Sequence, residues 1–154
     1  MKRKPSVILS LVLCVILGAV LAVWAFTFPF LFEKLYTAVH RGRLSAEDVA
    51  YVGRAVTIAF YACLPFALAA LGMLIKLLMN LLRGRVFVPG NVLLLRWLSW
   101  CCFAVFVVCC VQGMQYFPLF AVAVAMGVVG TLLQAVKSSW KVAVGLREDN
   151  DLTI

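Results

Sequence analysis

The chain has 154 residues, of which 66% are hydrophobic and 13% are charged, and its formal net charge is +8. A water-soluble domain of this size is about half apolar, so the composition excludes a soluble protein and indicates an integral membrane protein with one compact domain. The basic residues flank long apolar runs, a pattern that is typical of membrane orientation, so we expect no direct contact with nucleic acid.

The first predicted span covers residues 7–32, which carry no charge. This run is about twice as long as the apolar core of a signal peptide. It is also long enough to cross a bilayer, for which about 20 residues suffice. We therefore expect a transmembrane helix here.

The second predicted span covers residues 55–76 and follows a polar loop, residues 33–54. Within this loop, Ser45 precedes an apolar run and has Asp48 three positions later, which is the pattern of a helix cap. The helix is therefore expected to begin near Ala46, outside the hydrocarbon layer. Lys76 ends the uncharged run, and its long side chain can reach the membrane interface.

The third and fourth predicted spans, residues 97–113 and 118–136, come from one run without charge. As a single helix this run would be about 60 Å long, twice the hydrocarbon thickness of about 30 Å. We therefore predict that it folds back at "QGMQYFP", residues 112–118. A turn containing Gly84, Pro89, Gly90 and Asn91 is expected before the third span.

The lysines and arginines predict the orientation of the chain in the cell (inner) membrane. The side that holds both termini carries Lys2, Arg3, Lys4, Lys76, Arg83, Arg85, Arg96, Lys137, Lys141 and Arg147. The other side carries Lys34, Arg41, Arg43 and Arg54. Both termini are therefore expected in the cytoplasm, with residues 137–154 forming a cytoplasmic helix extension and an acidic tail.

Residues for catalysis or metal binding are sparse. All six cysteines fall in apolar runs, so we interpret them as buried free thiols. His40 is the single histidine and lies in a polar loop. No nucleotide-binding or hydrolase motif occurs, so we expect no enzyme, metal or cofactor. Gln112 and Gln134, the most polar residues of the last two spans, are expected to form hydrogen bonds within the bundle.

Small residues on the fourth span predict close helix packing. Ala123, Gly127 and Gly130 fall on one helix face, and such faces allow two backbones to approach. We expect the contact to lie within one bundle, with a homo-oligomer as the alternative. The predicted fold is thus an all-α integral membrane protein, a bundle of four transmembrane helices.

Two segments resemble the YoaS-like small bacterial membrane proteins, a four-span family with a domain of unknown function (2975). The loop "LLRGRVFVPGNVLLLR" matches the loop of this family at Phe87, Asn91, Val92, Leu95 and Arg96. The ending "LREDNDLTI" matches the acidic ending of the family at Leu146, Glu148, Asn150, Asp151, Leu152, Thr153 and Ile154. The resemblance implies a regulatory partnership with a Cro/CI-type helix-turn-helix regulator, and no known chemistry.

We therefore hypothesise a membrane-bound regulator with a cytoplasmic interaction face. The residues of this predicted face are Arg83, Arg85, Phe87, Asn91, Arg96, Glu148, Asn150, Asp151, Leu152 and Ile154. The tail is expected to dock on the inner loop, with Leu152 and Ile154 on one side of an extended segment. Alternatives are a small transporter or permease subunit and a structural protein that contacts anionic lipid.

Overall fold

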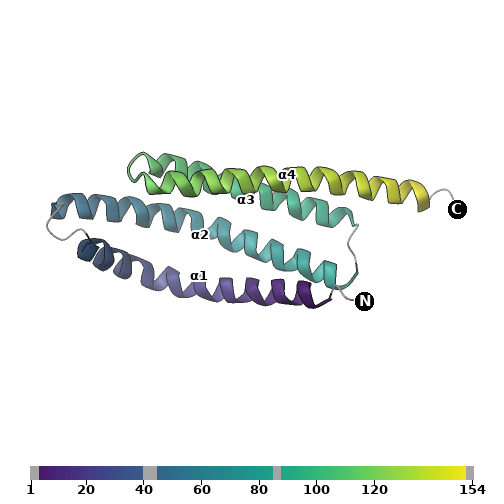
Figure 1. The fold of residues 1–154 in the computed structure, drawn as a ribbon, viewed down its shortest axis with the longest axis horizontal. Coiled ribbons are helices and arrows are strands. Elements are labelled where there is room, and N and C mark those ends of the chain that lie inside the picture. Colours follow the sequence, from purple (N-terminus) through teal and green to yellow (C-terminus); the bar gives the residue numbers. More distant parts are fainter. Residues whose placement is uncertain (1–3, 40–44, 85–87, 152–154) are drawn as a thin grey trace.

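The computed structural model describes residues 4–39, 45–84 and 88–151, apart from a few side chains within the helices. This part of the chain is helical and contains no strand. Its elements are α1 (Lys4–Val39), α2 (Ala46–Leu82), α3 (Pro89–Gly113) and α4 (Pro118–Asp151). The helices run up and down in turn, and α1 begins at the same end of the molecule at which α4 ends (Figure 1).

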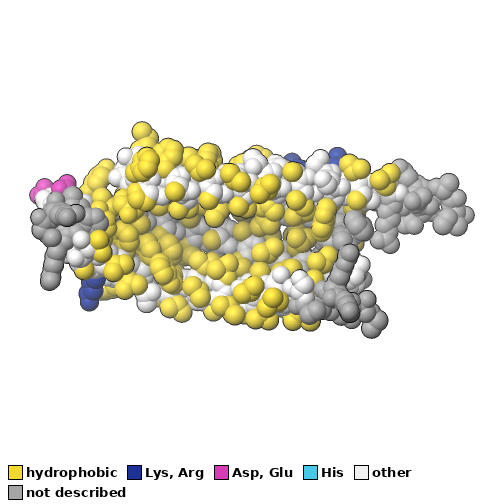
Figure 2. Space-filling view, viewed as in Figure 1, with side chains coloured by type: hydrophobic (Ala, Val, Ile, Leu, Met, Phe, Trp, Pro, Cys, Tyr) yellow, Lys and Arg dark blue, Asp and Glu magenta, His cyan; other side chains and the backbone are white. Residues whose placement is uncertain are grey.

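All four helices are long and apolar enough to cross a membrane. Hydrophobic side chains cover most of the face shown in Figure 2, and large ones such as Leu9, Val23 and Phe26 are exposed. Side chains of this kind are stable at a surface only when lipid covers them. The all-α membrane fold is therefore confirmed, and each of the four predicted spans lies within one helix.

Each helix packs on its neighbour in sequence. Within the described residues, α1 contacts α2, α2 contacts α3 and α3 contacts α4, and no other pair of helices touches. The contact between α3 and α4 is the most extensive, and Figure 1 shows α1 and α4 on opposite sides of the molecule. The bundle is therefore open between its first and last helices.

The ends of α2 follow local capping rules. The backbone N–H of Asp48 donates to Ser45 Oγ at 3.2 Å, and the Ser45 hydroxyl donates to Asp48 Oδ2 at 2.7 Å. This confirms the predicted cap. At the other end, Gly84 has a φ of +74° and donates its N–H to the Leu81 carbonyl at 3.1 Å. Glycine adopts this left-handed conformation without steric cost, so α2 ends there.

The start of α3 corrects one prediction. Pro89, Gly90 and Asn91 were assigned to a turn, but they form the first turn of α3. Proline is favourable at a first helical position, because its fixed φ suits the helix and the N–H that it lacks would have no partner there. The next turn of the chain, residues 114–117, lies inside the predicted hairpin at residues 112–118.

The small face of α4 packs on aromatic rings of α3. Ala123 is fully buried. A Cβ atom placed on Gly127 would lie 3.2 Å from the ring of Phe106, and one placed on Gly130 would lie 3.2 Å from the ring of Phe103. The buried Ser99 hydroxyl donates to the Gly130 carbonyl at 3.0 Å, which ties the two helices together beside this contact.

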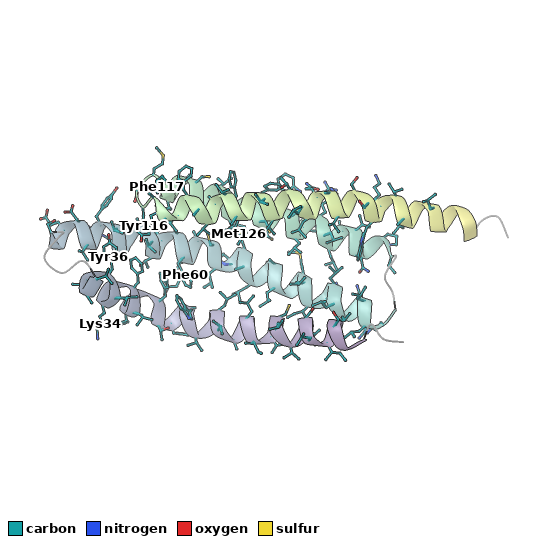
Figure 3. The ribbon with its side chains drawn as sticks, in the orientation of Figure 1. Lys34, Tyr36, Phe60, Tyr116, Phe117 and Met126 are labelled. Atoms are coloured by element: carbon teal, nitrogen blue, oxygen red, sulfur yellow. The ribbon has the colours of Figure 1, made fainter. Side chains whose placement is uncertain are left out.

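Aromatic side chains attach α1 to the rest of the molecule. The rings of Phe28 and Phe60 stack with their centroids 4.2 Å apart. The Tyr61 hydroxyl donates to the Ala25 carbonyl at 2.8 Å. Tyr36 meets Tyr116, in the turn between α3 and α4, edge to face at 6.3 Å (Figure 3). The end of α1 therefore touches this turn although α1 does not pack on α3 or α4.

The cysteines are free thiols, of which Cys14 and Cys109 are buried and the other four are half-buried. Cys63 on α2 faces Cys109 on α3, with the two sulfur atoms 4.0 Å apart. Among the described residues, no group of three or more potential ligands could hold a metal ion.

Candidate interaction face

The predicted interaction face is divided between three places. Arg83 follows the last turn of α2, Arg96 lies on α3, and both are exposed. The backbone of residues 148–151 belongs to α4, whose end lies beyond the start of α3 (Figure 1). Arg85, Phe87, Leu152 and Ile154 lie outside the described residues.

Asn91 has an internal position. Its side chain is fully buried, and its Oδ1 accepts a hydrogen bond from Asn80 Nδ2 at 2.8 Å. The bond joins the end of α2 to the start of α3. A partner protein therefore has no access to the Asn91 side chain, which instead holds the two helices in register.

Arg96 lies beside two tryptophans on the outer side of α3. It lines a cavity of about 350 Å³ together with Leu93, Trp97 and Trp100. Both tryptophans are 57% exposed. A basic side chain among exposed tryptophans is typical of the membrane–water boundary. The surroundings of Arg96 thus resemble a membrane–water boundary, whereas Arg83 lies earlier in the chain, directly after the last turn of α2.

The end of α4 is the part of this face that projects farthest. Val144 is buried, whereas Val142 and Leu146 are each 63% exposed. The helix continues through Asp151, since no proline or glycine follows Gly145 and extending a formed helix is favourable. The acidic residues up to Asp151 are thus helical, and the extended docked tail stays a prediction only for residues 152–154.

Neither glutamine behaves as expected. Gln112 Oε1 is buried and has no hydrogen-bond partner among the described residues. Gln134 Oε1 accepts a hydrogen bond from Lys137 Nζ at 2.6 Å, within α4 itself. The predicted hydrogen bonds between helices are therefore wrong for both residues. The helix periodicity places a glutamine on a face, but it does not show which group lies opposite.

A second polar site, which the sequence reasoning missed, lies at the other end of the molecule around Arg54. One cavity of about 340 Å³ is lined by Phe32, Val49, Ala50, Gly53, Arg54, Thr57 and Ile58. A smaller one of about 230 Å³ is lined by Tyr51, Arg54, Ala55, Ile58, Gln112 and Gln115. In the sequence, this site was indicated by the position of Arg54, which directly precedes the uncharged run of α2.

The comparisons with known proteins give one family. Residues 40–154 match the family described as "Protein of unknown function (DUF2975)". No curated protein and no solved structure matches the chain. The match covers the second, third and fourth helices and the acidic ending, and it confirms the family resemblance of the loop and tail.

Proposed function

We propose that this chain, which belongs to the DUF2975 family of proteins of unknown function, is a membrane-bound regulator that binds a soluble cytoplasmic partner. The end of α4 carries this proposal. Four apolar helices make the chain a membrane protein, and α4 continues past the start of α3 as a projecting helix (Figure 1).

The projecting helix combines an exposed apolar pair with an acidic sequence, and both suit a protein partner. Val142 and Leu146 are four residues apart, so they share one helix face, and both are exposed. The sequence that follows contains three acids, Glu148, Asp149 and Asp151. An apolar pair followed by acids suits a partner with an apolar groove and a basic surface.

A helix-turn-helix regulator has such a basic surface, because it binds DNA phosphates. If the acidic turn of α4 occupies that surface, the regulator is held at the membrane and kept from DNA. Transport has less support, because none of the four predicted spans carries a charged residue near its centre, where transport pathways usually carry ionisable groups.

Site-specific crosslinking tests the proposed partner contact. With a photoreactive amino acid in place of Leu146, irradiation of intact cells is expected to join the chain to a soluble helix-turn-helix regulator, identified by mass spectrometry. Neutralising Glu148, Asp149 and Asp151 with Gln or Asn should reduce the yield at least about fivefold, because charge pairs at the rim speed association.

The matched control places the photoreactive residue at Val124, which is 58% exposed on the same helix within its apolar part. This position should yield lipid adducts and no regulator. Equal protein adducts from both positions, or an unchanged yield after neutralising the three acids, would contradict the proposal.

The proposal requires both termini to be cytoplasmic, as the distribution of lysines and arginines predicts. A reporter that is active only in the cytoplasm is expected to be active when fused after Ile154 and silent when inserted at Gly42. If the reporter is silent after Ile154 and active at Gly42, the end of α4 lies outside the cytoplasm and a cytoplasmic partner is ruled out.

A further inference from the structure

The Arg54 site lies at the end of the molecule opposite the interaction face. It is formed by α1, the first turns of α2, the end of α3 and the turn that follows α3. The two cavities described above, of about 340 Å³ and about 230 Å³, both include Arg54 and Ile58 in their walls. Arg54 is therefore placed between a mainly apolar hollow and one that contains Gln112 and Gln115.

The depth of this site in the membrane follows from the apolar runs. The uncharged run of α1 ends at Phe32, and that of α2 begins at Ala55. Phe32 and Arg54 line the same cavity, so the two runs end at the same level. That level is the edge of the hydrocarbon layer, where phospholipid headgroups begin.

Arg54 and Gln112 both have unused hydrogen-bonding capacity. The Arg54 Nε donates to the Ala50 carbonyl at 3.4 Å, and the guanidinium makes no ion pair with a described carboxylate. Guanidinium has five donors and binds phosphate oxygens in a forked geometry. Gln112 Oε1 is a buried acceptor without a donor among the described residues, and leaving such a group unpaired is unfavourable.

We propose that this site binds the glycerophosphate headgroup of an anionic phospholipid. The Arg54 guanidinium pairs with the phosphate, and a hydroxyl of the glycerol headgroup donates to Gln112 Oε1. An acyl chain lies along Phe32 and Ile58, which line the larger cavity. A choline headgroup offers no donor to Gln112.

The apolar walls distinguish a lipid from a free phosphate ester. A soluble glycerol phosphate has the same charged group and hydroxyls, but it has nothing to place in the larger cavity. The lipid also reaches the site directly, because Arg54 and Ile58 are both exposed. This inference is independent of the proposed partner binding, which concerns the opposite end of the molecule.

Native mass spectrometry of the full-length protein in detergent tests this inference, with a short-chain phosphatidylglycerol as the probe. Arg54→Gln is expected to weaken binding about tenfold, since it removes a charged pair to phosphate. Gln112→Leu is expected to weaken binding of phosphatidylglycerol several-fold and to leave the weak binding of phosphatidylcholine unchanged. Circular dichroism and elution volume show that each variant is folded.

The matched control is Lys34→Gln, which removes one positive charge at the same end of the molecule. Lys34 is exposed and points away from the neighbouring helices (Figure 3), so this variant should bind the lipid like the parent protein. An equal loss in Lys34→Gln would show attraction by general charge and would overturn the site.

Two further probes decide the identity of the ligand. Phosphatidylcholine should bind several-fold more weakly than phosphatidylglycerol, because it has no donor for Gln112. The soluble sn-glycerol 3-phosphate should bind at least about tenfold more weakly, because it has no acyl chain. Equal binding of phosphatidylcholine would overturn the role of Gln112. Equal binding of sn-glycerol 3-phosphate would show a soluble ligand and overturn the lipid.

Discussion

Replacing Gly130 with leucine is expected to lower the free energy of unfolding by about 1–3 kcal/mol, because it overpacks the contact between α3 and α4. A Cβ atom at Gly130 would lie 3.2 Å from the Phe103 ring and 3.4 Å from the Cys102 Cβ. The Phe103 ring can turn, but the position of the Cys102 Cβ is fixed by the backbone of α3. The larger side chain therefore has to push the two helices apart.

Separation of α3 and α4 also lengthens the hydrogen bond from the Ser99 hydroxyl to the Gly130 carbonyl, which is 3.0 Å here. The measurement is reversible unfolding in mixed micelles with increasing SDS, followed by circular dichroism. The control is Gly145→Leu on the same helix, where an added Cβ meets nothing within 4 Å. If both variants unfold at the same SDS fraction, the close approach at Gly130 is not a source of stability.

Replacing Asn91 with alanine is expected to destabilise the connection between α2 and α3 by about 1–2 kcal/mol. The change removes a fully buried side chain and leaves Asn80 Nδ2 without the acceptor that lies 2.8 Å away. Asn80→Ala removes a side chain that is only half-buried, so it should lose less packing than Asn91→Ala.

A double-mutant cycle separates the amide bond from the packing of each side chain. The loss in the Asn80→Ala, Asn91→Ala double variant should be smaller than the sum of the two single losses, by about 0.5–1.5 kcal/mol. Each single variant leaves one amide without the other, whereas the double variant removes both amides. Unfolding in SDS measures the cycle. Strictly additive losses would show that the two side chains do not depend on each other.

The apolar run lengths allowed the four helices to be predicted from the sequence. A helix rises by a constant amount per residue and the hydrocarbon layer has a nearly constant thickness, so a count along the chain is enough. Ser45 and Gly84 end α2 through hydrogen bonds to residues three positions away, so the local sequence was enough to predict both ends. For the same reason, the turn between the third and fourth helices could be placed within a few residues.

Asn91 and Gln112 show where this reasoning stopped. Asn91 was assigned to a turn and to the cytoplasmic interaction face, but it is buried in a helix against Asn80. Gln112 was expected to have a partner, but its Oε1 has none among the described residues. In both cases the outcome depends on which side chain lies opposite, and residue spacing along one helix does not contain that information.

The sequence by itself determined the class, the number of spans and the turn between the third and fourth helices, because these depend on local backbone geometry and on the thickness of the bilayer. The tertiary structure alone decided that, among the described residues, each helix packs on its sequence neighbours and on no other helix, and that Arg54 shares a cavity with Gln112. Such contacts join residues from different helices, and lipid and protein are similarly apolar. Helix partners are therefore selected by the fit of side chains such as Gly130 against Phe103, which appears only when the helices are assembled.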